Sequence, residues 1–265
     1  MATCYRHPSR ETGVSCSNCG NPICPDCMTA TPVGMRCPDC AGKRQRVQTL
    51  RSMRVEPTVT YVLIGICVLL FVPSAGQGGS RVVTDLVLYG PLVADGEYWR
   101  LITAGFLHDP QLPAGFLHIG FNMYLLWLLG QMLEPALGHA RFLALYLASL
   151  VCGSLGALLL QPNQATLGAS GAVFGLMGAA FVMQRARGID PMQSGIGMLI
   201  VFNLGLGFII PNVSVGGHVG GLVGGAAAAY VMEWLARRRP GVAAPVAVCV
   251  AIGAAAGVAA VAVAG

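Results

Sequence analysis

The first forty residues contain four pairs of side chains of the types that bind metal ions. The members of each pair are separated by two residues, and the pairs are Cys4 with His7, Cys16 with Cys19, Cys24 with Cys27, and Cys37 with Cys40. A gap of two residues lets both side chains of a pair turn toward one ion. Eight such ligands satisfy two tetrahedral zinc sites. The spacing therefore predicts two zinc ions within residues 1–40.

The order of the pairs along the chain is compatible with more than one assignment of the eight ligands to the two zinc ions. We favour an interleaved arrangement, in which Cys4, His7, Cys24 and Cys27 bind one ion and Cys16, Cys19, Cys37 and Cys40 bind the other. This arrangement resembles a B-box or another cross-brace zinc finger. A disulfide scaffold is the alternative, but the cysteines of this region are odd in number and no signal peptide is visible. Structural zinc sites have no open coordination position, so we expect no catalysis here.

Four polar side chains stand out in the apolar remainder of the chain: His118, Asn122, Ser170 and His218. A serine that contacts a histidine can act as a nucleophile, with the histidine as its general base. His118 and Asn122 are four residues apart, so they share one face of a helix. Each residue also has an alternative role. Ser170 suits a helix N-cap, His218 suits a bond to a loop carbonyl, and the other two suit hydrogen bonds between helices.

The composition indicates that these residues lie in a membrane protein. Hydrophobic residues make up 55% of the 265 residues and charged residues only 10%, whereas soluble domains are about a quarter charged. A single soluble globule, a disordered chain and a fibrous repeat are therefore excluded. Aromatic residues are 7% of the chain and are not interleaved with a basic stripe, so nucleic-acid binding has no support.

The apolar runs predict an all-α membrane protein with seven transmembrane helices. A helix needs about 20 mostly apolar residues to cross a bilayer. The predicted spans are 58–74, 115–134, 140–160, 169–185, 194–210, 217–236 and 242–264. Single cysteines at positions 67, 152 and 249 are interpreted as small core residues.

The positive charges predict the orientation of these spans. With a cytoplasmic N-terminus, all of the 16 lysines and arginines except Arg81 and Arg100 lie on the inside. The helices that carry the four polar residues then all enter from the outside, which places those residues at one depth near the outer face of the cell membrane. Glycines at 171, 175 and 178 and at 217, 221 and 225 allow close helix packing. A short serine side chain needs such packing to reach a histidine on another helix.

The connection formed by residues 75–114 is too long for a simple turn. It contains Tyr89, Tyr98 and Trp99, which suit the lipid headgroup layer. We expect short helices in this loop. Arg100 is predicted to hold the loop together by hydrogen bonds, whereas His108 and His139 are given no catalytic role.

Several motifs in residues 58–236 resemble those of rhomboid intramembrane serine proteases. They are Trp99-Arg100, His118-x-x-x-Asn122, Gly168-x-Ser170-Gly171, and His218 followed by a glycine-rich run; Glu134 and Gly138 also resemble the family pattern. The resemblance implies a rhomboid-like bundle of six core helices plus one C-terminal helix. We therefore divide the chain into a zinc-binding head (1–40), a basic linker (41–57), a protease core (58–236), and a linker with the additional helix (237–265).

The resemblance further implies a Ser170–His218 dyad that forms an acyl-enzyme, with His118 and Asn122 stabilising the oxyanion. None of the 11 acidic residues lies at the outer ends of the helices that carry the dyad, which agrees with a site lacking a third, acidic member. The implied substrates are transmembrane proteins cut in or near their membrane segments. An inactive rhomboid-like protein that binds membrane clients is the main alternative, and a transporter is another. The zinc head would bind a cytosolic partner or stabilise the N-terminus.

Overall fold

The computed structural model describes residues 2–41, 55–75, 81–236, 238 and 241–265. Two compact units divide the chain, Met1–Arg54 and Val55–Gly265. Most of the predicted basic linker at 41–57 lies outside the described residues.

The N-terminal unit consists of short elements around buried cysteines. Strands β1 (Ala2–Thr3) and β2 (Glu11–Thr12) form one antiparallel pair, and β3 (Thr29–Thr31) and β4 (Gly34–Arg36) form another. A 3-10 turn, η1 (Pro25–Cys27), and a short helix, α1 (Pro38–Ala41), complete it. Apart from the cysteines, Ile23 is the only fully buried hydrophobic residue in the described part of this unit. Such a small apolar core cannot supply much folding energy.

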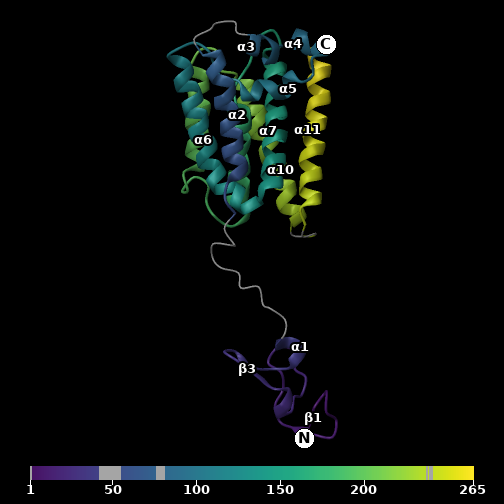
Figure 1. Ribbon diagram of the computed structural model, residues 1–265. Helices are drawn as coiled ribbons and strands as arrows, with labels where there is room; N and C mark the ends of the chain where they lie inside the picture. The colour runs from purple at the N-terminus through teal and green to yellow at the C-terminus, as the bar shows by residue number, and fades with distance from the viewer. Residues whose placement is uncertain (1, 42–54, 76–80, 237, 239–240) are drawn as a thin grey trace. The chain divides into compact units, whose positions relative to one another are not determined.

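The second unit is a helical bundle, as the composition predicts (Figure 1). Among the described residues its seven long helices are α2 (Thr58–Ser74), α6 (Ala114–Leu137), α7 (His139–Leu160), α8 (Ser170–Ala186), α9 (Ile196–Ile209), α10 (Val215–Ala236) and α11 (Ala243–Ala264). Each coincides with one predicted span to within three residues at either end. The largest difference is at α6, which continues through Pro135 to Leu137 instead of ending at residue 134.

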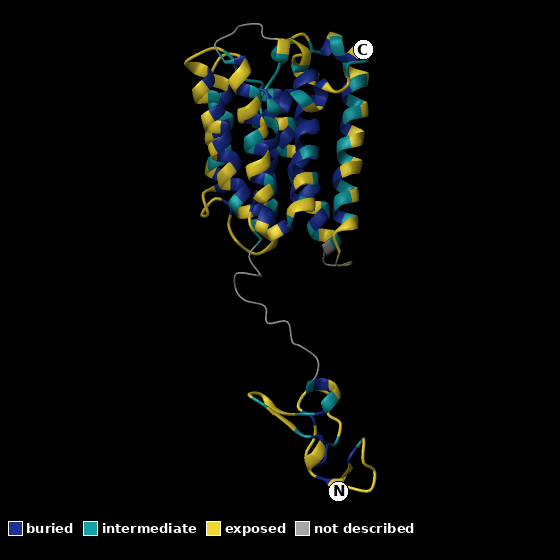
Figure 2. Ribbon diagram, viewed as in Figure 1, coloured by how far each residue is buried: buried dark blue, intermediate teal, exposed yellow. Residues whose placement is uncertain are grey.

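The outward surface of the bundle is apolar. Four of the described helices, α6, α7, α10 and α11, are long and apolar enough to cross a membrane, while α2 and α9 are shorter apolar helices. Large apolar side chains lie exposed, including Leu69, Leu117 and Phe208, each more than 70% accessible. Exposed residues follow the outer faces of the helices and buried residues the inner faces (Figure 2). This surface suits lipid and not water, so the protein is a multi-pass membrane protein.

Helices α7, α8 and α10 pack together in the interior of the bundle. Helix α10 lies along both of the others, while α11 packs against α7 and α2 against α6. Cys67, Cys152 and Cys249 are buried among these helices, in agreement with the prediction that they are core residues.

The long connection before α6 contains the short helices that the sequence analysis predicts. These are α3 (Arg81–Leu86), α4 (Gly90–Ala94), α5 (Arg100–Thr103) and the 3-10 turn η3 (Ala104–Phe106). Arg100 is buried and its guanidinium donates to the carbonyl oxygens of Thr84 and Val87, at 2.9 and 2.8 Å, and pairs with Glu97. Arg100 therefore holds this connection together, as expected.

Glu134 has a structural role that the sequence analysis did not foresee. Its side chain is fully buried and accepts hydrogen bonds from the backbone N–H groups of Val59 and Thr60, both at 2.8 Å, and from the Thr60 hydroxyl at 2.6 Å. The first N–H groups of a helix have no partner within it. Pro57 at the N-cap provides no side-chain cap, so the carboxylate of α6 caps α2.

Candidate active site

Ser170 and His218 meet between α8 and α10. The Ser170 Oγ lies 3.0 Å from the Nε2 of His218, although 48 positions separate the two residues. Ser170 is the first residue of α8 and is half-buried, while His218 is in the first turn of α10 and only 8% exposed. The distance is that of a hydrogen bond, so the serine can transfer its proton directly to the imidazole.

The glycines of α8 and α10 make this contact possible. A Cβ atom added at Gly221 would overlap the backbone carbonyl of Gly171, and one added at Gly225 would overlap that of Gly175. The two helix backbones are therefore closer than any side chain at these positions would permit. On the other side of α10, Gly156 of α7 is equally close to Gly216.

The loop that leads into α8 is held by the long connection that precedes α6. Leu88 and Thr166 form an isolated antiparallel bridge, and the Gly168 N–H donates to the Ala104 carbonyl at 3.0 Å. Gly168 has a φ of +128°, a conformation that favours glycine. A Cβ there would also lie only 3.1 Å from the His118 Nε2. Gly168 thus lets the chain turn past His118 immediately before Ser170.

His118 is placed beside the serine. Its Nδ1 accepts a hydrogen bond from the Asp109 N–H at 3.3 Å. A neutral imidazole that accepts at Nδ1 carries its proton on Nε2, the nitrogen that faces Gly168. His118 can therefore donate a hydrogen bond toward the region next to Ser170.

Asn122 lies one turn further along α6 and is 5% exposed. One N–H of its amide donates to the His118 carbonyl at 2.9 Å. An amide nitrogen has two hydrogens, so the second remains for another acceptor.

His108, which the sequence analysis gave no catalytic role, packs against His118. Its side chain is 1% exposed and its ring centroid is 5.1 Å from that of His118, edge to face. This contact was not predicted. Burial and, to a lesser extent, the neighbouring His118 lower the pKa of His108 to about 3, so its ring is neutral at pH 7. The contact is with a residue ten positions away across a loop, and no local pattern signals it.

Packing, and not a carboxylate, orients the imidazole of His218. Its ring stacks on Phe174 with a centroid distance of 4.2 Å and an interplanar angle of 21°. The other ring nitrogen, Nδ1, has no hydrogen-bond partner within the described residues. Phe174 therefore contacts the face of the imidazole, whereas the aspartate of a catalytic triad binds the ring edge at Nδ1.

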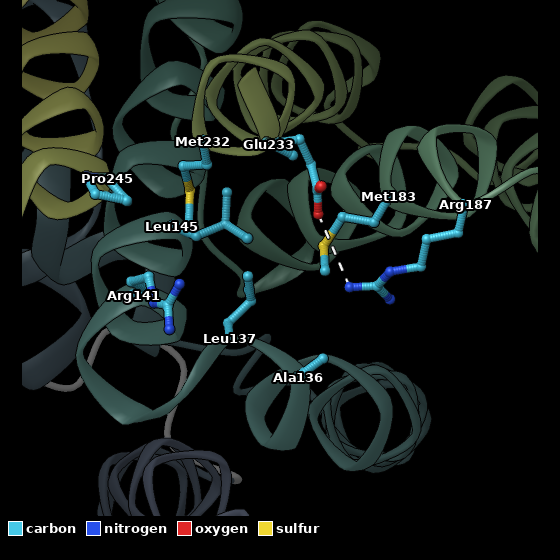
Figure 3. Close-up of a pocket in the computed structure, with 10 residues that line it drawn as sticks. Ala136, Leu137, Arg141, Leu145, Met183, Arg187, Met232, Glu233 and Pro245 are labelled. Carbon is cyan, nitrogen blue, oxygen red and sulfur yellow. Dashed lines mark ion pairs between the residues drawn. The ribbon is translucent and has the colours of Figure 1, made fainter. Parts of the chain in front are cut away.

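A cavity of about 210 Å³ lies at the opposite end of the bundle (Figure 3). Its lining includes Arg141 near the start of α7 and Glu233 near the end of α10. Because Ser170 and His218 lie at the beginnings of α8 and α10, this cavity is separate from the dyad.

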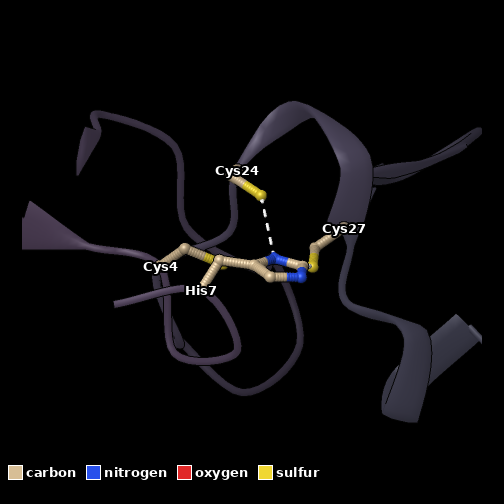
Figure 4. Close-up of side chains that lie close together, drawn as sticks. All are labelled: Cys4, His7, Cys24 and Cys27. Carbon is tan, nitrogen blue, oxygen red and sulfur yellow. Dashed lines mark hydrogen bonds between the residues drawn. The ribbon is translucent and has the colours of Figure 1, made fainter. Parts of the chain in front are cut away.

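The N-terminal unit brings together the ligands of each predicted metal site. The ligand atoms of Cys4, His7, Cys24 and Cys27 all lie within 4.8 Å of one another. In Figure 4 the imidazole of His7 lies among the three cysteines, and its Nδ1 is 3.4 Å from the Sγ atoms of both Cys24 and Cys27. This grouping matches the interleaved pairing that the sequence analysis favoured.

The remaining four cysteines, Cys16, Cys19, Cys37 and Cys40, form the second group, also within 4.8 Å. The Sγ atoms of Cys19 and Cys37 are 3.8 Å apart and no cysteine is in a disulfide. Zinc–sulfur bonds of about 2.3 Å in a tetrahedron place two sulfurs roughly 3.8 Å apart. The backbone N–H of Cys37 donates to the Cys16 Sγ at 3.3 Å. Both groups therefore fit zinc.

Comparison with known proteins places the bundle in a family. The rhomboid domain model matches residues 95–235. The chain is 38% identical over 181 residues to "Rhomboid protease GluP" of Bacillus subtilis, in an alignment that covers 66% of this chain and 34% of GluP. It is 36% identical over 178 residues to "Putative rhomboid protease YdcA" of the same organism, covering 65% of this chain and 87% of YdcA.

A plant protein, "RHOMBOID-like protein 5" of Arabidopsis thaliana, is 37% identical over 150 residues, which cover 53% of this chain and 46% of that protein. The chain thus spans a third of GluP and less than half of the plant relative. The region that the family model matches contains Ser170, His218, His118 and Asn122, together with the part of the long connection from residue 95 onward. The chain belongs to the rhomboid family.

Proposed function

We propose that this protein is an intramembrane serine endopeptidase that cleaves membrane-anchored proteins in or near their transmembrane segments. The observation that carries the proposal is the 3.0 Å contact between the Ser170 Oγ and the His218 Nε2. Two further findings support it: the relatives are named rhomboid proteases, and the polar cluster lies within an apolar helix bundle.

In the proposed reaction, the Ser170 Oγ attacks the carbonyl carbon of the scissile peptide bond while its proton passes to the His218 Nε2. The resulting tetrahedral intermediate collapses as His218 gives this proton to the leaving amine, which forms an acyl-enzyme on Ser170. A water molecule then attacks the acyl group and loses a proton to His218. The second tetrahedral intermediate collapses as His218 returns this proton to the Ser170 Oγ, which breaks the acyl bond and releases the peptide acid. His218 needs one fixed ring position for both transfers, and stacking on Phe174 provides it.

The oxyanion of the intermediate needs hydrogen-bond donors on the opposite side of the serine from His218. The Ser170 backbone N–H, the His118 Nε2–H and the second amide hydrogen of Asn122 serve as these donors in our proposal. Ser170 begins α8, so the positive end of the helix dipole adds to the stabilisation of the negative charge.

The substrate enters as an extended segment. A transmembrane helix hides its carbonyl groups in internal hydrogen bonds, so attack requires that the segment unwind beside the dyad. We place the N-terminus in the cytoplasm and the dyad near the outer face, because this orientation puts nearly all lysines and arginines inside.

In this proposal the N-terminal head is a structural domain that is folded around two zinc ions. Cys4, His7, Cys24 and Cys27 hold one zinc ion, and the other four cysteines hold the second. The metal supplies the folding energy that the small apolar core lacks. A folded head is then available to bind a cytosolic protein.

A serine-reactive fluorophosphonate probe tests the nucleophile. The full-length protein in detergent should be labelled, Ser170→Ala should not be labelled, and His218→Ala should be labelled far more slowly because its serine has no base. Ser194→Ala, which changes an exposed serine in the connection between α8 and α9, should be labelled like the wild type. A folded wild-type protein that resists the probe would instead favour the inactive client-binding alternative.

A further inference from the structure

The cavity at the opposite end of the bundle from the dyad has a distinct chemical character. The ends of α6, α8 and α10 and the beginnings of α7 and α11 surround it. Its volume is about 210 Å³, which is enough for a phosphate group and the carbon atoms next to it. None of the proposed chemistry at Ser170 involves this space.

The charged groups of the cavity are unbalanced. Arg187 faces Glu233, with 3.8 Å between the Nη2 and Oε1 atoms, and the dashed line in Figure 3 marks this pair. Arg141 has no ion-pair partner among the described residues, and its buried Nε has no hydrogen-bond partner. The lining thus has two guanidinium groups and one carboxylate, and only Arg187 pairs with that carboxylate, which leaves a net positive charge in a partly enclosed site.

The rest of the lining is apolar. Leu137, Leu145, Met183 and Met232 form walls beside the arginines (Figure 3). Helices of the bundle end here, so the cavity lies at the depth where phospholipid headgroups meet the hydrocarbon core. A site with a free guanidinium, apolar walls and this depth is complementary to an anionic amphiphile.

We propose that this cavity binds the phosphate group of an anionic phospholipid, with Arg141 as the principal donor. A guanidinium can bind phosphate oxygens through two parallel N–H bonds, and the unpartnered Nε of Arg141 provides one of these donors. Glu233 holds Arg187 and limits its contribution. Inorganic phosphate shares the recognised chemistry, but it would leave the apolar walls without a contact.

Short-chain lipids allow a direct binding test with the full-length protein in a neutral detergent. Dihexanoyl phosphatidylglycerol should raise the midpoint of thermal unfolding in a saturable way, whereas dihexanoyl phosphatidylcholine and inorganic phosphate at the same concentrations should not. Arg141→Gln should weaken the apparent affinity for phosphatidylglycerol at least about tenfold, the loss expected for one charge-assisted hydrogen bond.

Two variants control this test. Arg185→Gln removes an exposed arginine at the same end of α8 but outside the cavity lining, and it should bind like the wild type. Glu233→Gln should bind more tightly, because it removes the negative charge and frees Arg187. If Arg141→Gln fails to fold, the affinity of Glu233→Gln relative to the wild type still tests the proposal.

Equal weakening by Arg141→Gln and Arg185→Gln would overturn the proposal, since it would indicate a general surface-charge effect. Unchanged or weaker binding by Glu233→Gln would also overturn it. A response to inorganic phosphate as large as that to the lipid would assign the site to free phosphate and rule out the lipid.

Discussion

Each ring nitrogen near Ser170 has a different environment, and this difference separates the roles of the histidines. The Nε2 of His218 contacts the serine oxygen, whereas the Nδ1 of His118 is occupied by the Asp109 N–H and its Nε2 faces Gly168. One imidazole is thus placed to accept a proton and the other to donate a hydrogen bond. His108 packs against His118 and is buried, so it supports the donor and does not contact the nucleophile.

The His118→Ala variant tests the assignment of the oxyanion donor. We expect kcat to fall about 100-fold, within the range for loss of one such donor, with little change in KM because the donor acts mainly in the transition state. Initial rates with a model transmembrane substrate measure both constants. A thermal unfolding midpoint like that of the wild type is the control for folding. An unchanged kcat would remove His118 from the site.

At the scale of the helices, the close contact between α8 and α10 determines whether the dyad forms. The Gly221→Ala variant should lose fluorophosphonate labelling, because the added methyl group meets the Gly171 carbonyl and forces the helices apart. Overpacking of this kind also costs about 1–3 kcal/mol of stability. Gly205→Ala on α9, where a Cβ has no neighbour within 4 Å, is the matched control and should be labelled normally. Normal labelling of both glycine variants would show that the close contact between α8 and α10 does not position Ser170.

The cap that α6 provides for α2 makes a second prediction at this scale. Glu134→Ala should lower the free energy of unfolding by about 3 kcal/mol, because it leaves buried N–H groups of Val59 and Thr60 without an acceptor. Glu134→Gln keeps one acceptor oxygen and should lose less. Chemical unfolding in detergent measures both values. Equal stability of the wild type and the alanine variant would contradict the capping role.

For the whole molecule, the division into two units predicts that zinc binding by the N-terminal unit and the reactivity of Ser170 in the second unit are independent of each other. The purified protein should contain about two zinc ions per chain, and Cys24→Ser should contain about one, by elemental mass spectrometry. Cys249→Ser, which changes a cysteine buried in the bundle, should retain both. Removal of zinc by a chelator should leave labelling of Ser170 unchanged, because all of the described residues around the dyad belong to the second unit. A zinc content far below two would remove the proposed role of the head.

The sequence allowed much of this architecture to be predicted, but not the contacts between distant segments. Apolar runs predict the long helices to within three residues because lipid fixes both their length and their composition. The spacing of the cysteine pairs likewise predicts the two groups of ligands. The cap from Glu134 to α2 and the packing of His108 on His118 depend on how separate helices and loops meet, and no periodic pattern records this. Phe174 was missed for the same reason, since its ring looks like any other core residue in the sequence.

The most direct test of the proposed mechanism is cleavage of a model transmembrane substrate in liposomes by the wild type, Ser170→Ala and Ser194→Ala. The account predicts a single cut in or near the membrane segment by the wild type and by Ser194→Ala, and no product with Ser170→Ala. Cleavage by Ser170→Ala at the wild-type rate would contradict the assignment of Ser170 as the nucleophile.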